Sequence, residues 1–385
     1  MISVADALAH VLAGVSLVGT ETVPLPAGLG RVLSENLLAR VTQPAHDLSA
    51  MDGYALGEGI AWSVIGAAPA GHPFDGTLQT GQALRVYTGS VVPPGTVRVA
   101  AQEGATLAGD RLTVLASASP HIRRAGQDFG LGDVLVPVGV RLGPRAIGLA
   151  AAGNHPWLTV RRRPRVAILA TGDEVALPGA PIPPGGIVSS NAHAIAALVH
   201  VSGGEPCILP IATDRVESVV TAMTGTGADL LVTCGGASVG DFDVVREALR
   251  VVGFRESFWQ VAMRPGKPLL FGHAGLMPVL GLPGNPVSAF VCSVLFLRPA
   301  IAAMLGQATE TPFIPCRLTA AMAANDQRQD YVRATRHGQD VTPLSRQDSS
   351  LLSVLARAEA LIVRAPNAAA AAIGDVVLTI DLDST

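Results

Sequence analysis

The sequence predicts an α/β fold combined with two β-rich modules. Over residues 164–308, short apolar runs alternate with helix-like segments, as parallel βαβ units require. Over residues 41–138 and 309–385, short β-prone runs are separated by Gly and Pro instead. The chain has 385 residues, which suffices for two to four domains with substantial cores.

The segments before and after the first β-rich module have helical patterns. Apolar residues at helical spacing predict an amphipathic helix over 4–15, and a second short helix is expected over 30–38. Helical spacing returns briefly over 144–152. We interpret the arginine-rich run 161–165 as a solvated linker rather than an anion-binding patch.

The central module has the pattern of a doubly wound sheet. Strands are expected over 166–170, 207–210, 229–233 and 278–281, and a helix-like segment follows each of the first three. Asn191 is expected to cap a helix over 192–201, and Asp214 a helix over 215–223. Four later strands, over 316–319, 331–334, 360–363 and 376–380, predict a small C-terminal β domain.

Composition excludes several classes of protein. Hydrophobic residues make up 49% and charged residues 15%, which is unlike a disordered chain, and the net charge of −3 disfavours a nucleic-acid partner. The four cysteines form no Cys-x-x-Cys pair, so we expect neither zinc nor disulfides, and reduced thiols fit the cytoplasm. The longest apolar run, 287–305, contains Arg298 and Pro299, so no membrane span or signal peptide is expected.

Chemistry is expected where the central strands end. Ligands of open parallel sheets bind beyond the carboxyl ends of the strands. The loops that follow strands 166–170, 229–233 and 278–281 combine glycines with hydroxyls or carboxylates, including Ser238 and Ser288, as an anion cradle does. Glu174 and Asp243 would repel phosphates unless Mg²⁺ lay between them. The alternative is that the glycines only make turns and the acids cap helices.

Two cations lie close together before the apolar run 269–271. Arg264 and Lys267 flank Pro265-Gly266, a rigid turn that would fix the direction of Lys267 toward an oxyanion. An ordinary β-turn with surface cations is the alternative. The residues themselves thus indicate a phosphorylated, nucleotide-like ligand with Mg²⁺, and they do not specify a reaction.

Four segments together resemble the molybdopterin-binding domain shared by MoeA-type proteins and gephyrin-like E domains. They are Thr171-Gly-Asp-Glu174, Gly235-Gly-Ala-Ser-Val-Gly240 with Asp243, Pro265-Gly-Lys-Pro268 and Gly281-Leu-Pro-Gly-Asn-Pro-Val-Ser288. Ser49-Ala-Met-Asp-Gly-Tyr-Ala55 resembles the hallmark of the second MoeA domain. It is followed in family order by Thr88-Gly89, Glu103, Ile122-Arg123 and Asp128, and later by Arg328, Arg333, Gln347, Ser349 and Ser350. The resemblance spans essentially the whole chain.

The resemblance implies an elongated homodimer with four domains per subunit. They are a split helical domain (1–40 with 139–163), a β-rich domain (41–138), the α/β molybdopterin-binding domain (164–308) and a C-terminal β-barrel (309–385). The implied reaction inserts molybdenum from molybdate into adenylylated molybdopterin and releases AMP. The α/β cleft of one subunit would face the second domain of the other, and contact with the adenylyltransferase that makes the substrate is possible.

The resemblance also assigns roles to residues. The implied catalytic residues are Asp52, Thr88, Asp128, Glu174, Asp229 and Lys267. The implied residues for adenylylated molybdopterin are Thr171, Gly172, Gly235, Gly236, Ser238, Gly240, Pro283, Gly284 and Asn285. Molybdate would bind Lys267, Ser288, Arg328, Arg333 and Ser350, and Mg²⁺ would bind Glu174 and Asp243.

The chain departs from the family pattern at a few positions. Residues 95–99 read Gly-Thr-Val-Arg-Val, Arg264 stands where many relatives have Lys, and Asp348 replaces a common Gly, so the resemblance does not specify the anion contacts of that loop. Two other functions are alternatives to the one that the resemblance implies. A molybdopterin adenylyltransferase would not need the extra domains, and a gephyrin-like scaffold normally carries additional domains and a linker.

Overall fold

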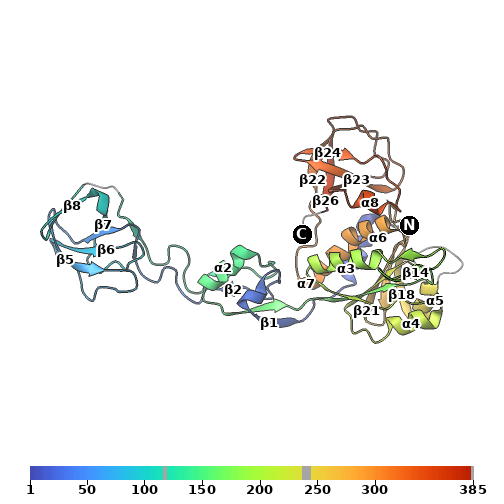
Figure 1. The fold of residues 1–385 in the computed structure, drawn as a ribbon, viewed down its shortest axis with the longest axis horizontal. Coiled ribbons are helices and arrows are strands. Elements are labelled where there is room, and N and C mark those ends of the chain that lie inside the picture. The colour runs from blue at the N-terminus through green and yellow to red at the C-terminus, as the bar shows by residue number, and fades with distance from the viewer. Residues whose placement is uncertain (116–118, 236–243, 383–385) are drawn as a thin grey trace. The chain divides into compact units, whose positions relative to one another are not determined.

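The computed structural model describes residues 1–115, 119–235 and 244–382 (Figure 1). Its internal contacts divide the chain into two units. Unit 1 comprises Met1–Glu21, Gly30–Val32 and Arg161–Thr385, and unit 2 comprises Thr22–Leu29 and Leu33–Val160. The finer division into four domains stays a prediction.

A six-stranded sheet lies at the centre of unit 1. Its order is β16 (Glu205–Ile208), β13 (Arg165–Ala170), β17 (Leu230–Cys234), β21 (Met277–Leu282), β20 (Leu270–Ala274) and β18 (Phe254–Trp259). The first four strands run parallel to one another, and β20 is antiparallel to both of its neighbours, β21 and β18. The chain leaves β13 toward β16 on one side and returns to β17 on the other, so the strand order reverses there. The predicted doubly wound α/β fold is confirmed.

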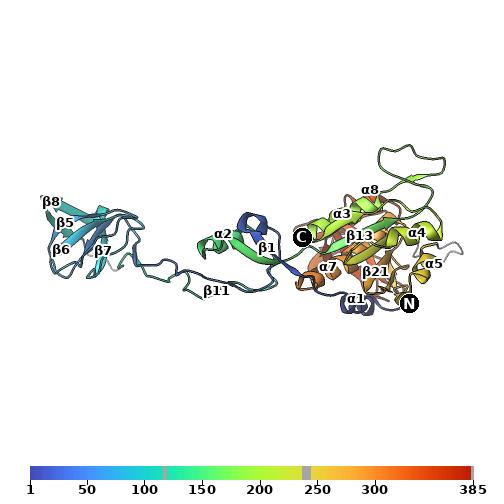
Figure 2. The same ribbon diagram turned by 90° about the horizontal axis from the view of Figure 1, so that it is seen from below.

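Helices cover both faces of this sheet (Figure 2). One face packs against α3 (Asn191–Val201), α6 (Pro286–Cys292) and α7 (Arg298–Leu305), and the other against α4 (Val216–Met223) and α5 (Val244–Val251). Val166 and Ile168 belong to the first core, Ala167 and Leu169 to the second, as the two-residue period of a strand requires. Helix α1 (Val4–Ala13) adds Ala7 and Val11 to the first core.

Three local predictions are wrong. Residues 30–38 form no helix: a 3₁₀ turn covers Leu25–Gly28, and Leu33 bridges to Val160 because long-range strand pairing outweighs the local pattern. Helix α3 includes Asn191, whose side chain does not cap it but donates to the carbonyl of Gly284. Helix α4 begins only at Val216, and Asp214 is bonded to the loop after β13 instead of capping it.

The apolar run near residue 300 is a buried helix. Helical structure is continuous over Pro286–Leu305, with a π-helical turn at Ser293–Leu297, and it passes through Arg298 and Pro299. The segment is long and apolar enough to cross a membrane by length and composition alone. However, 78% of its most apolar 18-residue stretch is buried inside unit 1.

A closed β-barrel completes unit 1. Strands β23 (Gln329–His337), β24 (Asp340–Pro343), β22 (Ile314–Leu318), β26 (Val376–Asp381) and β25 (Ala360–Arg364) pair in that order, and β25 pairs again with β23. This confirms the predicted C-terminal β-barrel. The short strand β19 (Met263–Arg264) of the α/β part pairs with β23, and helix α8 (Leu352–Leu355) lies against α6.

Unit 2 is β-rich, as predicted. One sheet has the order β7 (Arg98–Ala101), β4 (Gly53–Leu56), β6 (Gln82–Val86), β5 (Trp62–Ala68), β9 (Arg111–Val114) and β8 (Ala105–Ala108). A separate core in the same unit contains Val23, Leu142, Leu158 and Val160, with α2 (Pro144–Ala152) packed on it. This core is formed by segments from both ends of the unit.

Candidate functional site

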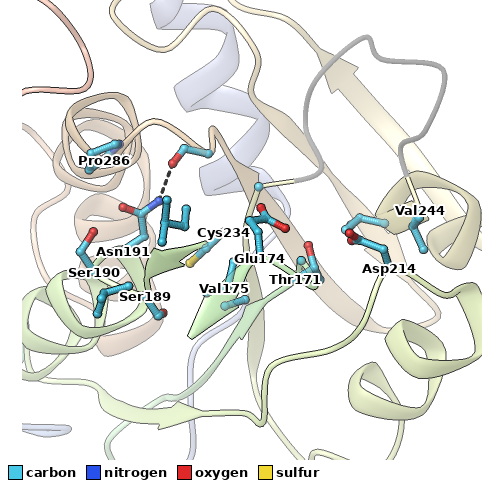
Figure 3. Close-up of a pocket in the computed structure, with 17 residues that line it drawn as sticks. Thr171, Glu174, Val175, Ser189, Ser190, Asn191, Asp214, Cys234, Val244 and Pro286 are labelled. Carbon is cyan, nitrogen blue, oxygen red and sulfur yellow. Dashed lines mark hydrogen bonds between the residues drawn. The ribbon is translucent and has the colours of Figure 1, made fainter. Parts of the chain in front are cut away.

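A cavity of about 510 Å³ opens at the carboxyl edge of the unit 1 sheet. It lies beyond the ends of β13 and β17, where the strand order reverses, which is the position at which open α/β sheets bind ligands. Figure 3 shows the side chains around it. The lining residues are Ala170, Thr171, Gly172, Glu174, Val175, Ile187, Val188, Ser189, Ser190, Asn191, Asp214, Cys234, Gly235, Val244, Val245, Gly284 and Pro286.

One end of the cavity is acidic. Thr171, Glu174 and Asp214 lie there, as Figure 3 shows. Gly172 has a φ of +133°, and a Cβ built on it would lie 2.5 Å from Oε2 of Glu174, so only glycine permits this position of the carboxylate. The loops after β13 and β16 are joined by two 3.3 Å bonds: Asp173 N–H donates to Asp214, and Asp214 N–H donates to Asp173.

The opposite end presents hydroxyl and amide groups. Ser189, Ser190 and Asn191 lie there beside Pro286 (Figure 3). The Asn191 side chain donates a 2.7 Å hydrogen bond to the carbonyl of Gly284, which joins the start of α3 to the loop after β21. Cys234 lies between the two ends, and burial raises the pKa of its thiol to about 12, so the group is neutral at pH 7.

The structure brings together part of the residues predicted to bind the substrate and Mg²⁺. Thr171, Gly172, Glu174, Gly235 and Gly284 all line the cavity. Pro283 and Asn285 adjoin it in the chain without lining it. Asn285 instead donates to the hydroxyl of Ser349 in the barrel at 3.0 Å. The other predicted members, Gly236, Ser238, Gly240 and Asp243, lie outside the described residues.

The residues predicted to bind molybdate are largely engaged within the protein. Arg333 is 1% exposed and donates to Oε1 of Gln347 and to the carbonyl of Asp348. Arg328 pairs with Asp326 at 2.7 Å, and hydrogen bonds from Arg328 lower the pKa of Asp326 to about 2. The remaining three members differ in exposure: Ser350 and Lys267 are exposed, whereas Ser288 is buried at the start of α6.

Asp229 is not brought into the cavity. It precedes β17, whereas the cavity lies beyond the last residue of that strand, so the two are at opposite edges of the sheet. Its carboxylate accepts two 2.6 Å bonds from Arg162 and one from the N–H of Arg165. Burial raises its pKa, but the bonds from Arg162 and Arg165 outweigh burial and leave the pKa below its usual value. This environment indicates a structural ion pair.

The other three predicted catalytic residues lie in unit 2. Asp52 accepts hydrogen bonds from the N–H of Thr88 at 2.7 Å and from its hydroxyl at 2.9 Å, and the N–H is the main cause of the lowered pKa of Asp52. The guanidinium carbon of Arg85 lies 5.0 Å from the centre of the Tyr54 ring and 5.1 Å from that of the Tyr87 ring. Asp128 is elsewhere in this unit, where its N–H donates to the carbonyl of Gln43.

Several cavity residues were missed from the sequence. Sequence patterns alone assign no role to Ser189 and Ser190, and they favour helix caps at Asn191 and Asp214. Asp214 follows β16, so the rule that ligands bind beyond the carboxyl ends of strands also indicates this residue. Nothing local distinguishes Asn191 from a cap, because the carbonyl that it binds is 93 residues away. Within the described ranges, no three His, Cys, Asp or Glu side chains form a metal-binding group.

A doubly wound sheet with this cavity, joined to a closed barrel, defines the class of the protein. Residues 167–303 match the model of a probable molybdopterin-binding domain. Residues 2–153 match the MoeA N-terminal region (domains I and II), and residues 315–382 match the MoeA C-terminal region (domain IV). The chain belongs to the MoeA family.

Individual relatives agree with this assignment. A molybdopterin molybdenumtransferase of Nostoc sp. is 35% identical over 83% of this chain and 77% of its own length. Molybdopterin molybdenumtransferase 2 of Mycobacterium tuberculosis is 34% identical over 84% of this chain and 85% of its own. The crystal structure of a molybdopterin biosynthesis MoeA protein from Pyrococcus horikoshii matches with a TM-score of 0.87 and 25% identity, covering all of both chains.

Proposed function

We infer that this chain is a molybdopterin molybdenumtransferase, which inserts molybdenum into molybdopterin during molybdenum cofactor biosynthesis. The observation that carries this conclusion is the match to all three MoeA regions in one chain, together with enzymes of that name at 34–35% identity over most of it. The adenylyltransferase and the scaffold are not favoured.

The form of the substrate is a finer proposal. We propose that adenylylated molybdopterin occupies the cavity and that molybdate is the second substrate, with AMP as the leaving product. The supporting observation is a cavity bordered by the glycine turns after β13, β17 and β21, because glycine lets the backbone approach phosphates closely. Assembly as a homodimer, with Asp52, Thr88 and Asp128 of one subunit completing the site of the other, is part of the same proposal.

We also propose that Mg²⁺ assists by neutralising the pyrophosphate of the substrate. Glu174 fits this role, because its carboxylate lies in the cavity and Gly172 leaves space for it. Mg²⁺ in proteins is commonly held by one or two carboxylates plus substrate phosphates, so a large protein cage is not needed. Asp243, the second proposed ligand, lies outside the described residues.

The proposed role of Lys267 has an additional basis in composition. Lys267 is the only lysine of the chain, and the other 26 of its 27 basic side chains are arginines. An ammonium is a compact point charge with three donors, whereas a guanidinium is a planar fork. The ammonium group suits a tetrahedral dianion such as molybdate, because it can contact a single corner of the tetrahedron. Lys267 is exposed on the rigid turn after Pro265 and Gly266.

Two assays distinguish the three candidate functions. Purified protein is incubated with adenylylated molybdopterin and molybdate, and AMP is measured. Molybdate-dependent AMP release supports the transferase. Consumption of ATP with molybdopterin would indicate the adenylyltransferase. If neither reaction is observed, the scaffold is the candidate that is left.

Replacing Lys267 with Ala tests how the anion is held. We expect at least a tenfold rise in the molybdate concentration for half-maximal rate, with unchanged thermal unfolding, because the side chain is exposed. Lys267→Arg is the matched control for charge, and it should recover only part of the affinity. Since no other lysine is present, reductive methylation modifies only Lys267 and the α-amino group, and molybdate should slow it at Lys267. Wild-type molybdate saturation in Lys267→Ala would refute the role.

A further inference from the structure

Hydrogen-bond donors from the barrel loop after β24 and from strand β23 converge on one residue, Asp348. The N–H of Ser350 donates to Oδ1 of Asp348 at 2.8 Å, and the Ser350 hydroxyl donates to the same oxygen at 2.6 Å. Arg333, which is fully buried, donates to the main-chain carbonyl of Asp348 at 2.9 Å. A peptide N–H and a hydroxyl directed at one negatively charged oxygen are the groups with which proteins bind oxyanions.

The Asp348 carboxylate is charged and accessible. The hydroxyl and N–H of Ser350, followed by the charges of Arg333 and Arg346, hold the pKa of Asp348 below its usual value. Asp348 and Ser350 are both exposed, so a small anion from solvent can reach the same donors. At neutral pH, any such anion therefore finds the Ser350 donors already bound to the negatively charged Asp348 carboxylate.

The loop that carries Asp348 is joined to the rim of the cavity. Ser349 accepts a hydrogen bond from the Asn285 side chain at 3.0 Å, and its carbonyl accepts one from the N–H of Val287 at 3.1 Å. Gly284 and Pro286, which line the cavity, belong to that same turn. The position of the Ser350 donors is thus set by the turn that borders the substrate cavity.

We propose that Asp348 is an affinity-determining residue of this enzyme: its carboxylate occupies the Ser350 donors as an internal anion and competes with molybdate for them. This rests on the proposed function, in which Ser350 and Arg333 belong to the molybdate site. Binding of molybdate then requires the carboxylate to turn away from Ser350, and repulsion between the two anions weakens binding further. The chain thereby takes molybdate only at higher concentration than it would with an uncharged residue at position 348.

Asp348→Asn separates charge from geometry. The amide oxygen of Asn can still accept both bonds from Ser350, so the loop is preserved while the negative charge is removed. Molybdate binding to the purified protein is measured by equilibrium dialysis without any pterin. We expect the Kd to fall roughly threefold to tenfold, the range for removing one exposed charge near a dianion in screened solvent.

Asp375→Asn is the matched control. Asp375 is an exposed carboxylate of the same barrel that also accepts a backbone N–H, from Ala372 at 2.8 Å, and its removal should leave the Kd unchanged. Adding Ser350→Ala to Asp348→Asn should abolish the gain. An unchanged or higher Kd in Asp348→Asn overturns the inference.

The two proposals fail in different ways. If molybdate affinity does not differ between wild type and Asp348→Asn while both release AMP from adenylylated molybdopterin, only the role of Asp348 is wrong. If no variant releases AMP, the proposed function fails, whereas the dialysis still reports whether Asp348 competes with the anion.

Discussion

Replacing Asp229 with Asn should destabilise unit 1 without altering catalysis. The variant loses the charge that accepts two 2.6 Å bonds from Arg162 and a third from the Arg165 N–H. Hydrogen bonds to charged groups contribute about 1.5–3 kcal/mol, and the Arg162 side chain is 38% exposed, so solvent screening favours the lower part of that range. We expect a loss of about 2 kcal/mol, or roughly 4–8 °C in Tm for a unit of this size.

The effect depends on pH in a defined direction. The pKa of Asp229 in the folded state lies below the 3.8 of an unperturbed aspartate, so the folded state favours the ionised form. The contribution to stability is fully present above that value and is lost as pH falls through the folded pKa. The difference in unfolding free energy between wild type and Asp229→Asn should therefore be constant near neutrality and shrink in acid below about pH 4.

Urea unfolding and AMP release measured on the same preparations test this reasoning. Asp340→Asn is the control, because its pair with Arg317 is exposed on both sides and should contribute less than about 0.5 kcal/mol. The rate per folded molecule should be that of wild type in both variants. Unchanged stability with a more than tenfold loss of AMP release in Asp229→Asn would place Asp229 in the chemistry and refute the structural role.

Two further predictions concern the cavity. Asn191→Ala removes the 2.7 Å bond to Gly284, so the turn after β21 is held less firmly. In steady-state kinetics, the KM for adenylylated molybdopterin should rise about fivefold with a smaller change in kcat, and an unchanged KM would contradict this role. Gly172→Ala places a Cβ 2.5 Å from the Glu174 carboxylate and strains a φ of +133°, so the proposed Mg²⁺ ligand is displaced. The Mg²⁺ concentration for half-maximal rate should rise at least tenfold. An unaltered Mg²⁺ titration would show that Glu174 is not a ligand.

The fold class could be predicted because it follows from periodicity. The apolar runs of β13, β17 and β21 are buried on both faces, and such strands are recognisable as short continuous apolar segments between glycine-rich loops. The rule that ligands bind beyond the carboxyl ends then located Thr171, Glu174 and Gly235 correctly at the cavity. Each of these inferences needs only neighbours within a few residues.

Contacts between distant segments decided the rest. Asp229 precedes a strand and Glu174 follows one, and only the parallel sheet puts them at opposite edges. Asn191 is indistinguishable from a helix cap until Gly284 is brought beside it, and Asp348 acquires its importance only when the barrel loop meets the start of α6. The sequence determines which hydrogen bonds a side chain is able to make. Which of several possible partners it binds depends on the packing free energy of the whole core.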